Sequence, residues 1–182
     1  MLKQSLIKQP QTLGSIADVF VGMRIPGWER KGTDYLIIKP QHIFDYKVHL
    51  GNNRKEYCNK DFVKSFADYQ KYFLKDGDVL VRMTGKPDFG IYSGEDNKVI
   101  ANGNTLVIRP NAENKKMLHE FFTSEAGINL FEKNLFKMYA RKFCGVPISQ
   151  ENFLNNMDIS ETDTEEKSFV SKITEMITKF FE

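Results

Sequence analysis

The segment Tyr72–Arg82, YFLKDGDVLVR, combines a polar turn with a short apolar strand. The turn is predicted at Lys75–Asp78, where Gly77 can adopt a positive φ without steric penalty. Val79–Val81 then form a continuous apolar run, which predicts a buried strand. The strand leads into Arg82–Pro87, a loop with two cations of the kind that a rigid scaffold presents to a ligand.

The composition is that of a globular protein with a sizeable core, because 41% of the 182 residues are hydrophobic and 13% are aromatic. Lys and Arg number 26 against 24 Asp and Glu, so affinity for nucleic acid would have to come from local clusters of cations. Cys58 and Cys144 lack metal-binding spacing and predict reduced thiols in a cytoplasmic protein. No run approaches the roughly 18 apolar residues of a membrane span, and neither a metal nor another cofactor is expected.

Further strands are predicted before and after the segment Tyr72–Arg82. Residues 13–22 are expected to form a short helical turn, capped by Ser15, that runs into a strand. Pro40 ends a second strand at Tyr35–Lys39. Later strands are predicted at Phe89–Tyr92, Lys98–Ala101 and Thr105–Arg109. Asn102-Gly103-Asn104, between the last two, predicts a β-hairpin turn, so the middle of the chain is expected to be a mixed or antiparallel sheet.

Beyond Asn111 the apolar period changes to that of helices. Two helical faces are predicted, formed by Met117, Leu118, Phe121 and Phe122 and by Ile128, Phe131, Leu135 and Met138, with Gly127 near their junction. A capping box at Thr162–Glu165 opens a last helix, in which Val170, Ile173, Ile177 and Phe180 have coiled-coil spacing. The predicted fold class is therefore α+β: a mixed or antiparallel sheet with flanking helices over residues 1–160, and a coiled-coil-like helix over 161–182.

Cations gather on the predicted loops. The loop Met23–Gly32 also holds the only tryptophan, and two interpretations stay open: Trp28 folds back onto the core, or the loop contacts phosphates and bases. Cations and aromatics interleave again at the end of the second helix, around Tyr139. The candidate nucleic-acid contacts are Arg24, Arg30, Lys31, Gln41, Arg54, Lys55, Arg82, Thr84, Lys86, Lys137, Tyr139, Arg141 and Lys142.

A catalytic alternative rests on three residues. Asp88, Asp96 and Lys98 occur in the order of a metal-dependent nuclease core, where two carboxylates hold a divalent ion and the lysine assists the attacking water. That mechanism needs the second carboxylate and the lysine on a strand, whereas Gly94–Lys98 has the composition of a turn. A chance match is therefore favoured. A nuclease and a protein-interaction module that does not bind DNA are kept as alternatives.

The order of several weak motifs is more specific than any one of them. These motifs are Leu13–Gly22, Tyr35–Ile43, Leu74–Arg82 followed by Gly85 and Gly90, Phe121–Gly127, Val146–Ile148 and Met157–Ile159. In this order they resemble the target recognition domain of the specificity subunit of type I restriction-modification enzymes. The resemblance extends over nearly the whole chain, from about Leu13 to Phe181.

This resemblance implies a non-catalytic protein that recognises specific sequences in double-stranded DNA. In that family, loops of the domain enter the major groove, and spacer helices dock the methyltransferase and restriction subunits. A full specificity subunit has two recognition domains and two long spacer helices, so this chain resembles a half-subunit or a fragment. The expected interface, for a partner subunit or a second copy, is Val170, Ile173, Ile177 and Phe180. Because the loops vary within the family, no family residue is carried onto Arg24–Lys31 or Arg82–Lys86.

Overall fold

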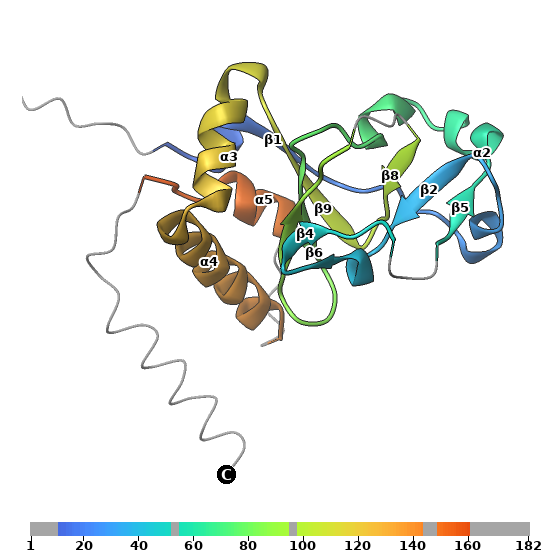
Figure 1. Cartoon of the computed structure of the whole chain (residues 1–182). Coiled ribbons are helices and arrows are strands. Elements are labelled where there is room, and N and C mark those ends of the chain that lie inside the picture. The colour runs from blue at the N-terminus through green and yellow to red at the C-terminus, as the bar shows by residue number, and fades with distance from the viewer. Residues whose placement is uncertain (1–10, 52–54, 95–97, 144–148, 161–182) are drawn as a thin grey trace, which may run out of the picture.

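Two β-sheets form the centre of the protein in the computed structural model, which describes residues 11–51, 55–94, 98–143 and 149–160 (Figure 1). The six-stranded sheet has the order β1 (Ala17–Val21), β9 (Thr105–Pro110), β6 (Val79–Arg82), β7 (Phe89–Ile91), β4 (Tyr46–Val48) and β3 (Ile43–Phe44). The three-stranded sheet has the order β5 (Tyr57–Cys58), β2 (Tyr35–Ile38) and β8 (Val99–Ala101). Strands β4 and β7 are parallel, as are β2 and β8, and the other pairs are antiparallel. The predicted α+β class with a mixed sheet is confirmed.

Helices cover the outer sides of the two sheets (Figure 1). The α-helices are α1 (Leu13–Ile16), α2 (Lys60–Lys64), α3 (Lys115–Thr123), α4 (Glu125–Phe143) and α5 (Gln150–Asn155). Short 3-10 helices are η1 (Gly27–Arg30), η2 (Pro40–His42), η3 (Tyr69–Tyr72) and η4 (Ala112–Asn114). Helices α3, α4 and α5 lie beside the six-stranded sheet, and α2 lies beyond the three-stranded sheet. Among the described helices, none is both long enough and apolar enough to cross a bilayer.

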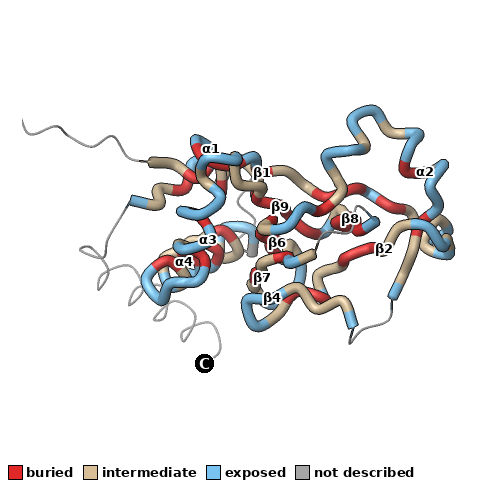
Figure 2. Tube along the Cα trace, turned by 45° about the horizontal axis from the view of Figure 1, so that its top comes forward, coloured by how far each residue is buried: buried red, intermediate tan, exposed pale blue. Residues whose placement is uncertain are grey.

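Strand β6 is buried on both faces, as its continuous apolar run predicts. Val79 and Val81 pack with the helices in one cluster, whereas Leu80 packs in a second cluster that lies between the two sheets. Ile37 and Ile38 of β2 divide in the same way, with Ile37 in a third cluster that includes α2. Figure 2 shows the buried residues running along the central strands of both sheets. The period-2 alternation of strands therefore joins helices, large sheet, small sheet and α2 into one packed stack.

The predicted helical faces are confirmed in α3 and α4 except at Met117, which is exposed. Leu118 and Phe122 of α3 are buried, as is Phe131 of α4, and the rings of Phe122 and Phe131 meet edge to face at 4.9 Å. Gly127 lies in the first turn of α4, where a Cβ atom would collide with the carbonyl oxygen of Phe121. Glycine is therefore required where the two helices approach most closely.

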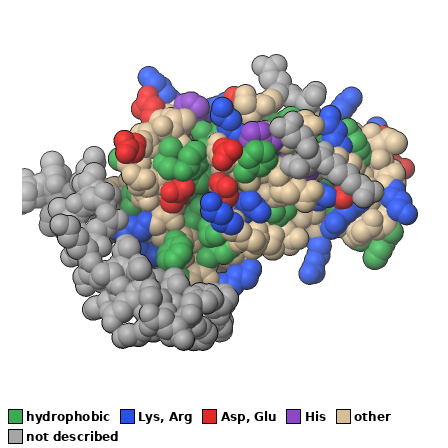
Figure 3. All heavy atoms as spheres, turned by 60° about the horizontal axis from the view of Figure 1, so that its bottom comes forward, with side chains coloured by type: hydrophobic (Ala, Val, Ile, Leu, Met, Phe, Trp, Pro, Cys, Tyr) green, Lys and Arg blue, Asp and Glu red, His purple; other side chains and the backbone are tan. Residues whose placement is uncertain are grey.

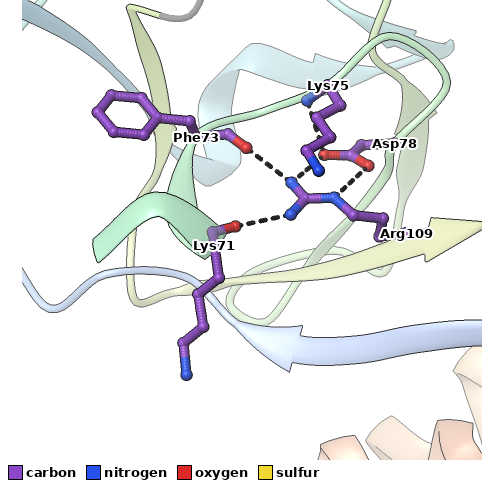
Figure 4. A network of polar contacts seen from close by, with 5 residues as sticks. All are labelled: Lys71, Phe73, Lys75, Asp78 and Arg109. Carbon is purple, nitrogen blue, oxygen red and sulfur yellow. Dashed lines mark hydrogen bonds and ion pairs between the residues drawn. The ribbon is translucent and has the colours of Figure 1, made fainter. Parts of the chain in front are cut away.

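The segment Tyr72–Arg82 is fixed by a buried ion pair (Figure 4). Gly77 has a φ of +86°, as the sequence predicts, and the turn places Asp78 opposite Arg109 of β9. The Arg109 guanidinium donates to both oxygens of Asp78, at 3.0 and 2.7 Å, and to the carbonyl oxygens of Lys71 and Phe73, at 2.9 and 2.6 Å. Asp78 is only 1% exposed. One arginine thus ties η3, the polar turn and β9 together.

The predicted hairpin at Asn102-Gly103-Asn104 is wrong, although its turn forms. The Thr105 amide donates to the Asn102 carbonyl oxygen at 2.9 Å, which closes the turn. However, β8 pairs with β2 in the small sheet, whereas β9 pairs with β1 and β6 in the large one. Because both edges of β9 are occupied, no edge remains for β8. The turn therefore carries the chain from one sheet to the other.

Other predictions are corrected or lie outside the described residues. Ser15 does not cap α1, because it lies inside the helix and its hydroxyl donates to the carbonyl oxygen of Thr12, the residue at the N-cap. Ser149 is the residue at the N-cap of α5, where its side chain accepts a hydrogen bond from the Asn152 amide. The predicted coiled-coil helix, with its capping box Thr162–Glu165 and seam residues Val170, Ile173, Ile177 and Phe180, falls outside the described residues, as does Arg54.

Candidate nucleic-acid interface

The residues that follow β2 and β8 emerge at the same edge of the small sheet, because these two strands are parallel. The Asn102 amide donates to the Ile38 carbonyl oxygen at 2.8 Å, which holds the two chain segments together just beyond the strands. Lys39 and Gln41 follow on one segment, and Asn104 follows on the other. Polar side chains that are distant in the sequence thus meet at one edge.

The turn Asn102–Asn104 also binds the loops that follow β1 and β6. The Met23 amide donates to the Ala101 carbonyl oxygen at 2.8 Å, and the Met83 amide donates to the Asn104 carbonyl oxygen at 3.0 Å. Gly22 is packed so closely against the turn that a Cβ atom would overlap the carbonyl oxygens of Ala101 and Asn102. The turn is therefore the shared support of the loops around it.

These loops enclose two adjoining hollows of about 660 and 370 Å³, which share Arg30, Asn102 and Asn104. We call the two hollows together the polar groove. Its wall is formed by segments after β1, β2, β6 and β8. Its charged and hydrogen-bonding side chains are Arg24, Arg30, Lys39, Gln41, Arg82, Thr84, Asn102 and Asn104.

The polar groove is electropositive. None of the described residues that line it is acidic, and its cations are Arg24, Arg30, Lys39 and Arg82. The ammonium group of Lys39 is paired with Glu56 at 2.6 Å, but none of the arginines has a carboxylate within ion-pair distance among the described residues. In Figure 3, which brings the bottom of Figure 1 forward, acidic side chains are concentrated on the left half, and Lys and Arg predominate on the right, over the small sheet. The groove can therefore attract an anionic polymer despite a net charge of only +2.

Arg82 holds a distinctive position at the end of β6. Its Nε atom is buried and has no hydrogen-bond partner among the described residues. Thr105 is its register partner on β9, so both side chains leave the same face of the sheet, and the Thr105 hydroxyl is likewise buried without a protein partner. Buried polar groups of this kind normally bind water or a ligand.

The end of α4 supports the loop between β6 and β7. The Tyr139 hydroxyl donates to the Arg82 carbonyl oxygen, and the Lys142 ammonium donates to the Met83 carbonyl oxygen at 3.3 Å. Burial raises the pKa of Tyr139 to about 12, so the phenol remains a donor at neutral pH. Tyr139 and Lys142, which the sequence predicts as DNA contacts, therefore hold the loop by its backbone.

Two further predicted contacts line a separate hollow. Lys137 and Arg141 of α4 face α5 across a space of about 560 Å³. The Arg141 guanidinium lies 5.5 Å from the centre of the Phe153 ring, a cation–π contact. Of the predicted residues, the structure thus gathers Arg24, Arg30, Gln41, Arg82 and Thr84 in the polar groove and places Lys137 and Arg141 elsewhere.

Exposed residues complete the predicted set. Lys31 follows η1, Lys55 precedes β5, and Lys86 lies on the same loop as Arg82; all three are exposed. The interpretation that Trp28 folds back onto the core is wrong, because its side chain is 77% exposed. Ile25, which is 2% exposed, takes the core position of this loop, and η1 then turns the chain outward.

Sequence reasoning missed Lys39, Asn102 and Asn104 as groove residues. The sequence predicts Lys39 at the end of a strand and the two asparagines in a hairpin turn, and neither prediction reveals that these residues lie together. The available signal is that the predicted strand Tyr35–Lys39 ends in a lysine and that Asn102 directly follows the predicted strand Lys98–Ala101. Parallel pairing would bring these polar ends to one edge, but neither sequence pattern indicates the direction of pairing.

The catalytic alternative gains no support from the described residues. Burial raises the pKa of Asp88, against the lowering effects of the Phe89 backbone amide and of Arg82. Asp88 accepts a hydrogen bond from the Phe89 amide at 2.9 Å. Asp96 lies outside the described residues, and Lys98 is exposed beside β8. Within the described ranges, no cluster of three or more His, Cys, Asp or Glu residues could hold a metal ion.

Comparisons with known proteins leave the family undefined. Neither a scan against protein-family models nor a search of curated proteins finds a match to this chain. Function must therefore be inferred from the polar groove, from the loops that form it and from the order of motifs in the sequence.

Proposed function

We propose that this chain binds double-stranded DNA at specific sequences, as a target recognition domain of the type I specificity-subunit class. The observation that carries this proposal is the polar groove: arginines and side-chain amides on loops from both sheets line it, without an acidic residue among its described lining. Phosphates require the cations, and base edges require the bidentate donors and acceptors. The protein would then direct methyltransferase and restriction subunits to the bound site.

The groove contains the side-chain types that read base pairs. Arg82 lines the groove, its buried Nε has no partner among the described residues, and arginine is the preferred bidentate partner of guanine. Gln41 and Asn104 carry amides, which pair with the N6 and N7 edge of adenine. Arg24 and Arg30 provide charge for the flanking phosphates. We assign base reading to the first three residues and backbone contact to the last two.

The loops are suited to binding because the fold holds them in place. Arg30 donates through Nε and Nη2 to the Ile25 carbonyl oxygen, at 3.1 and 3.0 Å, and so stiffens its own loop. Tyr139 fixes the loop that carries Arg82. A preformed site loses less conformational entropy on binding, which favours specific affinity.

The near-neutral net charge suits a domain that works within a larger assembly. The hollow with Lys137 and Arg141, which Asp158 also lines, offers a second region for phosphate contacts, away from the polar groove. Partner subunits would supply further contacts, and the segment with Val170, Ile173, Ile177 and Phe180 is the proposed surface for a methyltransferase subunit or a second copy of the chain. The proposed partners are thus double-stranded DNA and the other enzyme subunits.

Selection from a random duplex pool tests this function. The purified full chain is used alone and together with a type I methyltransferase subunit, with a variant carrying Arg24→Ala and Arg82→Ala as the matched control. A common sequence motif should be enriched by the wild-type chain and lost with the variant. Failure of both preparations to enrich any motif or to bind duplex in a salt-dependent manner would overturn the proposal.

A further inference from the structure

Trp28 is the only tryptophan of the chain and the most exposed of its large apolar side chains in the described ranges, at 77%. A tryptophan buries about 150–250 Å² when it is covered, so leaving the indole in water forgoes one of the largest available hydrophobic contributions. Isolated exposed apolar residues are common, but exposure to this degree is unusual for tryptophan. Whether the exposed indole has a function is therefore judged from the turn that carries it and from the residues near that turn.

The turn that carries Trp28 is braced from both sides. Before it, the Ile25 carbonyl oxygen accepts two hydrogen bonds from the Arg30 guanidinium, and the Glu29 amide donates to the Pro26 carbonyl oxygen at 3.1 Å. After it, the Gly32 amide donates to the Tyr57 carbonyl oxygen at 3.0 Å, which fastens the chain to β5. The exposed indole is thus displayed by a fixed turn.

This turn also borders the polar groove. Gly27 and Arg30, the first and last residues of η1, both line the groove, and Trp28 lies between them in the same 3-10 helix. Arg24 and Lys31 add charge within a few residues. Glu29 is the one acidic residue of η1, so the cations outnumber it, and the turn that carries the indole borders a groove already suited to phosphates.

The same surroundings argue against a protein partner for Trp28. Protein interfaces place such an anchor in an apolar patch that is depleted of charge. In the described part of the chain, the other large exposed apolar side chains are Tyr46, Met117 and Phe136, which lie on β4, α3 and α4. None of them belongs to η1. A nucleic acid, which offers flat aromatic bases between anionic phosphates, matches an isolated indole beside a groove lined by arginines.

We propose that Trp28 stacks on a base of the bound duplex and opens one base step at the edge of the sequence read by the polar groove. This inference rests on the proposed DNA-binding function and extends it. Apolar side chains that enter a base step partly unstack it and bend the duplex, so positions outside the groove also contribute to specificity.

Because Trp28 is the sole tryptophan, its emission reports the contact directly. The full chain is titrated with the most enriched duplex of the selection described above, and binding is followed in parallel by DNA anisotropy. Tryptophan emission should be quenched and protected from acrylamide as the complex forms. Replacing each purine of the duplex in turn by 2-aminopurine should give a rise in probe fluorescence at one step only.

Variants separate stacking from mere proximity. Trp28→Ala should weaken binding about tenfold and abolish the 2-aminopurine signal, whereas Trp28→Phe should retain part of both. Phe136→Ala, which removes an exposed aromatic side chain from α4, should change neither. Because Trp28 is exposed, these variants should leave the fold intact, which circular dichroism checks.

The outcomes are distinguishable. If anisotropy shows binding but tryptophan emission and 2-aminopurine fluorescence stay unchanged, the stacking is wrong and the DNA-binding function stands. Quenching without any 2-aminopurine signal also overturns the stacking, since it places the indole against the backbone alone. If anisotropy detects no duplex binding at any salt concentration, the proposed function fails, and the stacking fails with it.

Discussion

Single residues determine whether the loops of the polar groove can come together. Gly22 is the clearest case, because the carbonyl oxygens of Ala101 and Asn102 occupy the space that a Cβ atom would need. These oxygens belong to backbone and cannot move without shifting the turn that supports the groove. The polar groove therefore requires a glycine at position 22.

Gly22→Ala should lower the free energy of unfolding by about 3 kcal/mol, because the methyl group forces β1 away from the turn. Gly51→Ala is the matched control, since a Cβ atom at Gly51 meets no atom within 4 Å, and it should change the value by less than about 0.5 kcal/mol. Urea unfolding measures both variants. Equal values for the two variants would mean that the close approach at Gly22 is not real.

Cys58 makes a pH-dependent contribution. Burial raises the pKa of its thiol to about 11. The unfolded thiol ionises at lower pH, so between about pH 9 and 11 the unfolded state releases a proton that the native state keeps, and the free energy of unfolding falls as the pH rises. The fall attributable to Cys58 is at most about 2–3 kcal/mol.

Comparison with Cys58→Ala isolates this effect from other titrating groups. The variant should be less stable than the wild type at pH 8, because it loses a buried side chain of the third core cluster. The stability gap between the two proteins should narrow by pH 10.5. Urea unfolding at both pH values measures it, and a gap that stays constant would contradict the buried thiol.

The chemical type of a residue was a better guide to the groove than its position in the sequence. Arg24, Arg30, Gln41 and Arg82 could be selected from the sequence because cations and amides on loops are recognisable as contact residues. Asn104 could not, because its sequence context is that of a hairpin turn. Its location depends on which strands pair, and pairing is set by burial across two sheets rather than by local sequence.

The ion pair of Asp78 and Arg109 connects two elements of the fold, the polar turn before β6 and strand β9. The carboxylate is buried, and the guanidinium also donates to two backbone carbonyl oxygens. Removing one partner leaves the other charge buried without compensation. Such a loss is costly even where the intact pair contributes little net stability.

Asp78→Asn should therefore lower the free energy of unfolding by about 3–5 kcal/mol. Lys115→Ala breaks the neighbouring but exposed pair with Asp76 and should cost no more than about 1 kcal/mol. Both values come from urea unfolding at pH 7. The structural role assigned to Asp78 would be refuted by a loss as small as that of Lys115→Ala.

Helix α4 acts on the groove through the loop that it supports. Tyr139→Phe removes the hydroxyl that donates to Arg82 and should cost about 1 kcal/mol of unfolding free energy. Because this hydrogen bond fixes Arg82 itself, at the end of β6, affinity for the selected duplex should also fall. Tyr46→Phe, which removes an exposed hydrogen bond to Glu132, is the control and should alter neither quantity appreciably. Stability measurements paired with DNA anisotropy decide, and an unaltered affinity for Tyr139→Phe would exclude the positioning role.

The elements themselves were largely predictable, whereas their arrangement was not. The apolar run of β6, the stop at Pro40 after β2 and the helical faces of α3 and α4 follow from local patterns. The division into two sheets does not. Runs such as Val99–Ala101 are buried on both faces, and a continuous apolar run does not reveal the sheet to which it belongs.

At the scale of the whole molecule, the groove lies where the two sheets meet. The turn Asn102–Asn104 passes from β8 to β9, and so from one sheet to the other. Loops from both sheets reach this point and carry their cations with them. The fold thereby concentrates positive charge locally, although the chain as a whole is nearly neutral.

Charge in the polar groove and charge in the separate hollow between α4 and α5 should act differently on DNA binding. Arg82 in the polar groove is assigned to base reading, and Arg141 in the second hollow to phosphate contact. Arg141→Ala should therefore weaken binding to all duplexes alike and reduce the slope of log K against log salt by about 0.9. Lys116→Ala, on the exposed side of α3, is the control for loss of a distant charge.

The most direct test of sequence reading by the polar groove is the ratio of affinities for the selected and a random duplex, measured by anisotropy for the wild type and Arg82→Ala. The variant should lose about 1–3 kcal/mol of binding free energy on the selected duplex and much less on the random one, so the ratio should fall by about tenfold or more. An unchanged ratio, with equal losses on both duplexes, would contradict the assignment of Arg82 and of the groove as the reader of sequence.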